Sequence, residues 1–319
     1  MARADVAALW DDSAYNAGFI IIKPTNASKR LYHTIRSMTN KSRGMDDQAA
    51  LNRAIGVLRK QNVRLNAAVL NKRRFLCGLH YFERLQSQFA TDRQKCDRQN
   101  YSNCVVVVHN NWMVGKAAKV YRFREHLMWM YDGDDQYYTS NNRLYLSYNN
   151  HAWKMYHHTG LPTQKPSVVL ESEISALKTA MTIGYILNRT VILPRFHTGS
   201  KLTESTLGSV LHIQSFDKYF SGKYRENNFL FHPKVPLDVK SGLCNQRLIN
   251  RLDNSSSPRQ VLSDTDIARQ FGNLTGRVLM FESLDDVYIV LGNSTEDFMF
   301  TEKLRRAVLH GDYRQFKRW

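Results

Sequence analysis

Residues 105–123 read VVVVHNNWMVGKAAKVYRF, and this stretch decides how the chain is interpreted. Four consecutive valines predict a buried strand, because β-branched side chains pack well on a pleated sheet. The run ends at His109, and amides, a tryptophan and spaced basic residues follow directly. We therefore expect this strand to leave the core and deliver functional side chains to one place.

Strands alternate with helices on both sides of this stretch. Residues 19–22 and 63–70 are typical of strands, whereas residues 31–38 and 46–60 carry apolar side chains at helical spacings. The same alternation returns later in ESEISALKTAMTIGYILN, RTVILP, GRVLMFE, DVYIVLG and a last helix over residues 300–310. The alternation predicts an α/β protein, in which ligands bind beyond the carboxyl ends of the strands.

The regular pattern breaks up between residues 132 and 166, where Asp, Asn, Tyr, Gly and Pro dominate. Such a turn-forming composition marks a boundary between domains. We predict a first domain over residues 1–145, a linker over 146–166 and a second α/β domain over 167–319. The length of 319 residues is also more natural for two domains than for one.

The chain is strongly basic, with a formal net charge of +17 at pH 7. This charge favours anionic partners: nucleic acid, anionic lipid headgroups, acidic glycans or the phosphates of a nucleotide. The basic residues come in twos and threes with acidic residues between them, and no zinc-finger, RRM or basic-zipper pattern occurs. We therefore expect no nucleic-acid partner. An RNA-binding α/β protein stays an alternative that needs aromatic and basic residues on one face.

The four cysteines show no metal-ligand spacing, so a zinc site is not expected. Cys96 and Cys104 either close a small loop disulfide or remain buried free thiols. Asn-x-Ser/Thr sequons favour the secretory lumen. They begin at Asn26, Asn40, Asn100, Asn188, Asn254, Asn273 and Asn293.

The chain has no stretch of about 18 apolar residues that would cross a membrane, and its opening is not typical of a signal peptide. We therefore expect either a cytosolic protein or a sequence that lacks its true N-terminus.

Two short motifs in the first domain are candidate ligand contacts. Asn16 offers a donor and an acceptor, and Gly18 lets a ligand approach the backbone closely. Asp47 and Gln48 open a helix and place a carboxylate beside an amide, which suits sugar hydroxyls. The alternatives are an ordinary Asn-x-Gly turn and an ordinary acidic helix start.

The segment after the valine run is the third candidate. His109 can ligate a divalent cation, and Lys116 and Lys119 can neutralise phosphate oxygens. Asn110 and Asn111 can hold hydroxyl groups. The alternative is a satisfied histidine at a strand end beside solvated lysines.

Other motifs give little support to further enzyme classes. Asp132, Gly133 and Asp134 form an Asp-x-Asp sequence. They lie in a turn-rich boundary, however, and aspartates are common in such loops without binding a metal. GxSxG, Walker A, GxGxxG and HExxH motifs do not occur.

Four segments taken in order resemble one family: YNAGFIIIKPT, DDQAALN, VLNKRRFLCGLHYF and VVHNNWMVGKAAKVYRFREHLMW. The family is that of nucleotide-diphospho-sugar transferases among Golgi glycosyltransferases, which includes the plant rhamnogalacturonan xylosyltransferases. The resemblance covers roughly residues 10–131 of the chain. It implies a GT-A fold, a nucleotide-sugar donor, a glycan or glycoprotein acceptor and Mn²⁺ or Mg²⁺.

Carried over position by position, the resemblance makes Asp47 and Gln48 catalytic residues that face the reacting sugars. It makes His109 a metal contact, by similarity to glycogenin-like enzymes, although the spacing to the following lysines is longer here. The resemblance and the residue chemistry together place six residues at the donor: Asn16, Gly18, Asn110, Asn111, Lys116 and Lys119.

One departure from the family concerns the Asp-x-Asp pair that grips metal and diphosphate. In the family it lies on a strand upstream of the NAGF-like segment, and this sequence begins at that segment. We therefore expect a partial GT-A sheet and an incomplete chain that is weakly active or inactive. The family also implies the Golgi lumen, with a type II membrane anchor in the missing N-terminal part.

The second part, ALKTAMTIGYILNRTVILPRF, resembles the opening helix and strand of O-fucosyltransferase-type domains. The alternative is a generic α/β helix-strand unit. For the whole chain, the alternative to a glycosyltransferase is a non-catalytic basic protein, derived from a transferase, that binds glycans or acts as a scaffold.

Overall fold

The structure is a computed structural model that describes most of the 319-residue chain. It divides into two compact units, Met1–Met113 and Val114–Trp319, which are described separately. The expectations for Cys96, for Asp132–Asp134 and for most of the predicted linker lie outside the described residues. The residues that the structure describes are 3–41, 44–84, 104–129, 136–140, 142–150, 166–198, 203–205, 207–246, 260–284 and 287–309.

The described strands of the first unit form two small sheets. One has the order β2-β1-β3, in which β1 (Val6–Asp11) runs antiparallel to β2 (Ala14–Ile22) and parallel to β3 (Ala67–Val69). The other pairs β4 (Phe75–Cys77) with β5 (Val107–His109) in parallel. The predicted strand in the valine run is therefore present but shifted, because β5 starts at Val107 and includes His109 as its last residue.

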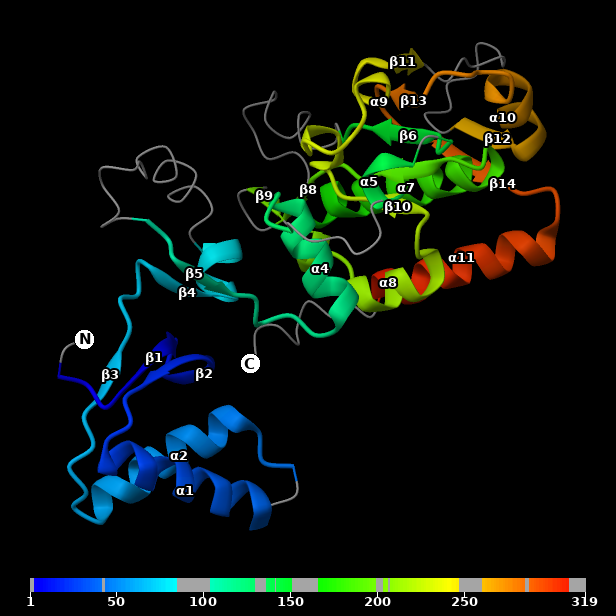
Figure 1. Ribbon diagram of the computed structural model, residues 1–319. Helices are drawn as coiled ribbons and strands as arrows, with labels where there is room; N and C mark the ends of the chain where they lie inside the picture. Colours follow the sequence, from blue (N-terminus) through cyan, green and yellow to red (C-terminus); the bar gives the residue numbers. More distant parts are fainter. Residues whose placement is uncertain are drawn as a thin grey trace. The chain divides into compact units, whose positions relative to one another are not determined.

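Helices α1 (Asn26–Lys41) and α2 (Asp47–Lys60) lie side by side in this unit (Figure 1). Asp46 caps α2, since its carboxylate accepts a hydrogen bond from the Ala49 N–H at 2.6 Å. The apolar faces of both helices pack against β1 and β2. Their shared core contains Val6, Leu31, Leu51, Ala54, Ile55 and Leu58. Both helices were predicted from apolar spacing, and a π-helical segment, η1 (Leu79–Arg84), follows β4.

A five-stranded, fully parallel sheet organises the second unit, in the order β10-β7-β6-β13-β11. Strands β6 and β13, the first and the last of this sheet in chain order, are hydrogen-bonded neighbours. Its strands are β6 (Tyr145–Tyr148), β7 (Thr190–Ile192), β10 (Tyr224–Arg225), β11 (Leu243–Gln246) and β13 (Val278–Phe281).

Two shorter strand pairs account for the other strands among the described residues of this unit. Strands β8 (Phe196–Thr198) and β9 (Thr203–Ser205) are antiparallel, whereas β12 (Gln260–Ser263) and β14 (Val287–Val290) are parallel. The long helix α7 packs against β6, β7 and β14. The helices of the unit are α4 (Lys116–Glu125), α5 (Gln136–Thr139), α7 (Pro166–Ile186), η3 (Leu207–Ser209), α8 (Ile213–Phe220), η4 (Phe229–Phe231), α9 (Leu237–Ser241), α10 (Asp264–Phe271) and α11 (Ser294–Leu309).

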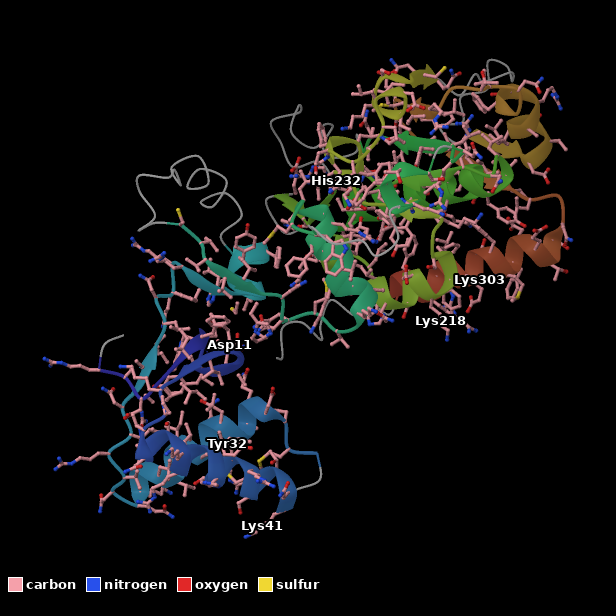
Figure 2. All side chains as sticks on the ribbon, in the orientation of Figure 1. Asp11, Tyr32, Lys41, Lys218, His232 and Lys303 are labelled. Atoms are coloured by element: carbon pink, nitrogen blue, oxygen red, sulfur yellow. The ribbon has the colours of Figure 1, made fainter. Side chains whose placement is uncertain are left out.

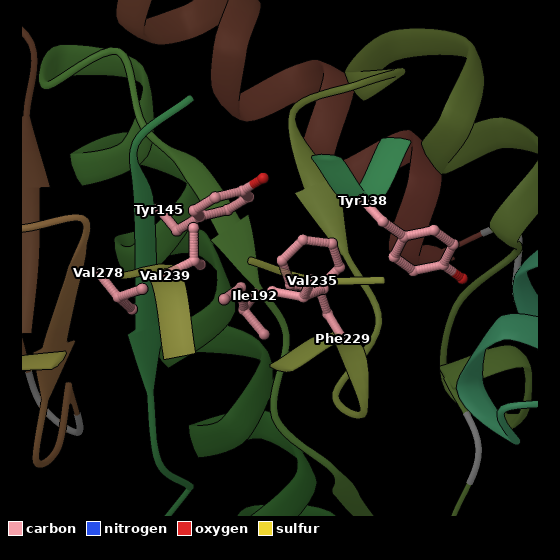
Figure 3. Close-up of a cluster of buried hydrophobic side chains, with 7 residues drawn as sticks. All are labelled: Tyr138, Tyr145, Ile192, Phe229, Val235, Val239 and Val278. Atoms are coloured by element: carbon pink, nitrogen blue, oxygen red, sulfur yellow. The ribbon is translucent and has the colours of Figure 1, made fainter. Parts of the chain in front are cut away.

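The core of the second unit packs aromatic and β-branched side chains against the sheet. Figure 3 shows one such cluster, formed by Tyr138, Tyr145, Ile192, Phe229, Val235, Val239 and Val278. Beside it, the buried Arg189 guanidinium donates hydrogen bonds to the carbonyl oxygens of Leu274 at 2.6 Å and Gly276 at 2.8 Å. A buried cation is thus satisfied by backbone acceptors and ties the start of β7 to the loop before β13.

The division between the units differs from the predicted linker at 146–166. Residues just after Met113 belong to the second unit because α4 packs on α8 and η3, and because β6 is the central strand of its sheet. Both units mix helices with strands, as the alternation in the sequence predicted. Within the part of the chain that the structure describes, the helices are too short or too polar to span a membrane.

Candidate functional site

The carboxylate of Asp11 is the centre of the candidate site in the first unit. Asp11 ends β1 (Figure 2), and the residue is only 8% exposed. Its Oδ2 accepts hydrogen bonds from Asn16 Nδ2 and Asn111 Nδ2, each at 3.0 Å, and its Oδ1 accepts one from Trp112 Nε1 at 2.6 Å. One carboxylate therefore joins the end of β1 to β2 and to the segment that follows β5.

The two asparagines are also bonded at their amide oxygens. Asn16 Oδ1 accepts from the Gly18 N–H, and Asn111 Oδ1 accepts from the Gly78 N–H, both at 2.7 Å. Donor and acceptor groups that the sequence suggested for a ligand are thus engaged within the protein. The structure makes both asparagines part of the framework of the site, and their contact with a donor stays a prediction.

Gly18 and His109 meet directly. A Cβ atom placed on Gly18 would lie 2.0 Å from His109 Cε1 and 2.3 Å from His109 Nδ1, closer than atoms can approach. The imidazole therefore occupies the space that any larger side chain at position 18 would need. The sequence favoured a glycine here for the close approach of a ligand, whereas the structure shows the close approach of His109.

Asn52 connects the start of α2 to β2. Its Oδ1 accepts from the Tyr15 N–H at 3.0 Å, and its Nδ2 donates to the carbonyl oxygens of Tyr15 at 2.7 Å and Gln48 at 2.8 Å. Gln48 is thereby tied to the residue next to Asn16. Asp47 is exposed at the same helix end. The catalytic role of Asp47 and Gln48 stays a prediction, but the start of their helix is anchored beside the Asp11 cluster.

Sequence reasoning did not single out Asp11 or Asn52 as site residues. Asn52 stands in the DDQAALN segment and lies four residues after Gln48, so helical spacing places both on one face. Asp11 had no comparable signal. Its three partners are five, 100 and 101 residues away in the sequence, and only the folded chain brings them together.

A chain of three polar side chains lies at the end of β4. Cys77 Sγ is 3.1 Å from His80 Nδ1, and His80 Nε2 is 3.4 Å from Asp12 Oδ1. The order Cys-His-Asp is that of an activated nucleophile. Burial raises the pKa of the Cys77 thiol to about 11, however, and the thiol is fully buried. Cys77 therefore stays protonated and serves packing, not nucleophilic attack.

The remaining cysteine expectation is tested only in part. Cys104 is disulfide-bonded, whereas Cys77 and Cys244 are free thiols. This agrees with the disulfide alternative for Cys104, while Cys96 lies outside the described residues.

The predicted phosphate contacts, Lys116 and Lys119, are exposed on the first turns of α4. Gly115 precedes this helix with φ of +95°, and Gln214 Oε1 accepts a hydrogen bond from the Ala117 N–H at 3.2 Å. Both lysines belong to the second unit. Asn110 belongs to the first unit and is 7% exposed. For these three residues, contact with a donor stays a prediction.

The described residues do not fit a metal site on their own. Among them, no three or more His, Cys, Asp or Glu side chains are grouped so that they could hold a metal ion. The Asp11 carboxylate already accepts three hydrogen bonds, which leaves little capacity for a cation. Mn²⁺ and Mg²⁺ need several oxygen or nitrogen ligands, so His109 alone is not sufficient.

Comparison with known proteins bears on this same part of the chain. Searches against curated proteins and against solved structures found no match. The model of one protein family, however, matches residues 4–123, a segment that contains every candidate residue described above. The family is that of the nucleotide-diphospho-sugar transferases, and the match supports this assignment for residues 4–123.

Proposed function

We propose that residues 4–123 form part of the donor site of a glycosyltransferase that takes its sugar from a nucleoside diphosphate. The family match carries the proposal, because it covers the residues that meet around Asp11. The Asp11 cluster lies at the carboxyl ends of β1, β4 and β5, and this location supports the proposal because ligands of α/β proteins bind beyond the carboxyl ends of strands.

The chemistry asked of such a site is the stabilisation of a departing diphosphate and the alignment of two sugars. In the proposal, Asp47 and Gln48 of the first unit hold sugar hydroxyls, while Lys116 and Lys119 keep the phosphate-binding role that the sequence predicts for them. His109 contacts the phosphates or their cation from its position over Gly18. Because the described residues do not form a metal site, we derive no step through Mn²⁺ or Mg²⁺.

The acceptor and the compartment belong to the proposal as well. We propose a glycan or a glycoprotein as acceptor, because family enzymes join sugars to such molecules. The sequons favour the secretory lumen, and the family resemblance narrows this proposal to the Golgi. The parallel sheet of the second unit is compatible with the O-fucosyltransferase-like alternative and with a generic α/β unit.

The test is calorimetric titration of the whole chain with UDP, GDP and CDP, each with and without MnCl₂. We expect one nucleotide to bind, and His109→Ala to weaken that binding. His33→Ala is the matched control, because His33 is an exposed histidine of α1 in the same unit. Failure of all three nucleotides to bind would contradict the proposed function.

Two further outcomes separate the finer points. Binding that is equal with and without MnCl₂ would argue against a metal contact while leaving the donor site in place. Binding of immobilised glycans without any nucleotide would instead favour the non-catalytic alternative, a basic protein that binds glycans.

A further inference from the structure

We infer that Asp11 is the positioning residue of the proposed donor site and acts through Asn16, Asn111 and Trp112. This inference rests on the proposed function. Asp11 itself is 8% exposed and its oxygens face three N–H donors of the protein, so it does not act by touching the substrate. Its effect is to hold two chain segments in one arrangement.

The bonds to Asp11 are of the strong kind. An ionised carboxylate that accepts from N–H groups in a buried place forms shorter and stronger hydrogen bonds than neutral pairs do. The distance of 2.6 Å from Trp112 Nε1 is at the short end of the usual range. The bonds of the two asparagines, at 3.0 Å, converge on the other oxygen.

Trp112 shows why the segment after β5 needs to be held. Its φ of +59° lies in the left-handed region, which is unfavourable for a bulky side chain. The hydrogen bond to Asp11 offsets part of that cost and fixes the direction of the indole. The backbone of Asn111 closes the same turn, since its N–H donates to the His109 carbonyl oxygen at 2.8 Å. Asp11 therefore sets the geometry of the turn that starts at His109.

Asp11 also positions strand β2, through its hydrogen bond with Asn16. The Asn16 side chain donates a hydrogen bond to Asp11 and accepts one from the Gly18 N–H. It therefore links the Asp11 carboxylate to the Gly18 backbone, which the His109 ring contacts closely. The His109 ring thus lies against Gly18, whose N–H donates to Asn16, and the His109 carbonyl oxygen accepts from the Asn111 N–H; both asparagines donate to Asp11. Loss of the carboxylate would loosen the imidazole and the indole together.

Asp11→Asn is the sharpest substitution, because it keeps the shape and replaces one oxygen by an NH₂ group. That group must face either Trp112 Nε1–H or the two asparagine amides, and each of these is a donor. We expect the affinity for the bound nucleoside diphosphate to fall about tenfold or more, as for the loss of a charge-assisted hydrogen bond. Asp12→Asn is the control: Asp12 is exposed, and its φ of +54° suits asparagine.

A double-mutant cycle separates positioning from a general loss of stability. If Asp11 acts through Trp112, Asp11→Asn and Trp112→Phe together should weaken affinity less than the product of the two single effects. Affinities are compared at a temperature at which every variant is folded. An Asp11→Asn affinity within twofold of the native one, or independent effects of the two changes, would overturn the inference. If Asp11→Asn does not fold, Trp112→Phe alone decides, with an affinity loss supporting the inference and an unchanged affinity refuting it.

A spectroscopic measurement tests the role of Asp11 independently of nucleotide binding, and so independently of the proposed function. In a chain labelled with ¹⁵N-tryptophan, the Trp112 indole N–H resonance is identified by its loss in Trp112→Phe. We expect it to move and to exchange faster with solvent in Asp11→Asn, and to stay in place in Asp12→Asn. If no nucleotide binds the native chain, the proposed function fails and this resonance alone decides: an unmoved resonance overturns the role of Asp11.

Discussion

A glycine-to-alanine pair in the first unit tests the arrangement around His109. At Gly18, a new Cβ would lie 2.0 Å from His109 Cε1, 2.3 Å from Nδ1 and 2.4 Å from Nε2. At Gly56, in the middle of α2, a new Cβ would meet no atom within 4 Å. The two substitutions add the same methyl group to the same unit, so the surroundings alone decide their effects.

The expected effects have opposite signs. An ordinary carbon contact needs at least 3.4 Å, so Gly18→Ala must displace the His109 ring by more than 1 Å. Overpacking of this kind costs about 1–3 kcal/mol. Gly56→Ala should instead stabilise the unit by about 0.5–1 kcal/mol, because alanine loses less backbone freedom in a helix.

The measurement is hydrogen exchange of backbone amides in increasing urea, followed by mass spectrometry of peptides from residues 6–22 and 47–60. Because the readout is local, it reports the free energy of unfolding of the first unit separately from that of the second. Nucleotide affinity is measured in parallel, and we expect it to fall in Gly18→Ala only. A Gly18→Ala protein with native stability and native nucleotide affinity would refute the placement of His109 over Gly18.

Two further outcomes follow from side chains in the two units. Burial raises the pKa of Glu125 to about 7, with the Glu226 charge adding to the rise and the Leu207 N–H, Arg122 and Arg195 opposing it. Because this folded value lies above the ordinary 4.5, the stabilisation is complete below pH 4.5 and is lost as the pH rises through 7. The loss is about 3 kcal/mol at roughly 1.4 kcal/mol per pH unit. Glu125→Gln should remove this pH dependence from hydrogen exchange in the second unit, and an unchanged dependence would speak against it. Asn52→Ala should lower the unfolding free energy of the first unit by about 2 kcal/mol, through three lost hydrogen bonds. Protection of residues 14–22 measures that loss, and native protection would contradict it.

Much of the fold was predictable because it rests on local patterns. Apolar spacing predicted α1 and α2, and both are present with Asp46 as the cap of α2. The β-branched runs predicted β2, β5 and β7. The division of the chain was less accessible, because turn-rich composition marks loops wherever they occur. Strand β6 lies inside the turn-rich region, yet it pairs with β7 and β13 at the centre of a sheet.

The candidate site divides in the same way between local and distant interactions. The sequence identified residues with the right chemistry, and four of them meet: Asn16 and Asn111 share Asp11, Asn16 bonds the backbone of Gly18, and His109 lies against Gly18. The sequence could not show what these groups bond to. Asp11 owes its role to partners about 100 residues away, and such pairs leave no spacing to read in a single sequence.

The chemistry of asparagine explains why a motif predicted to bind a ligand can instead serve the structure of the protein. An amide that both donates and accepts suits a sugar hydroxyl, and it suits equally well a buried turn that must satisfy a carboxylate and a backbone N–H. In this chain Asn16 and Asn111 serve the second purpose, each between Asp11 and a glycine N–H. The groups they support are the His109 imidazole over Gly18 and the Trp112 indole. In the proposed donor site, the buried carboxylate that positions those two rings is therefore expected to matter more for recognition than the amides themselves.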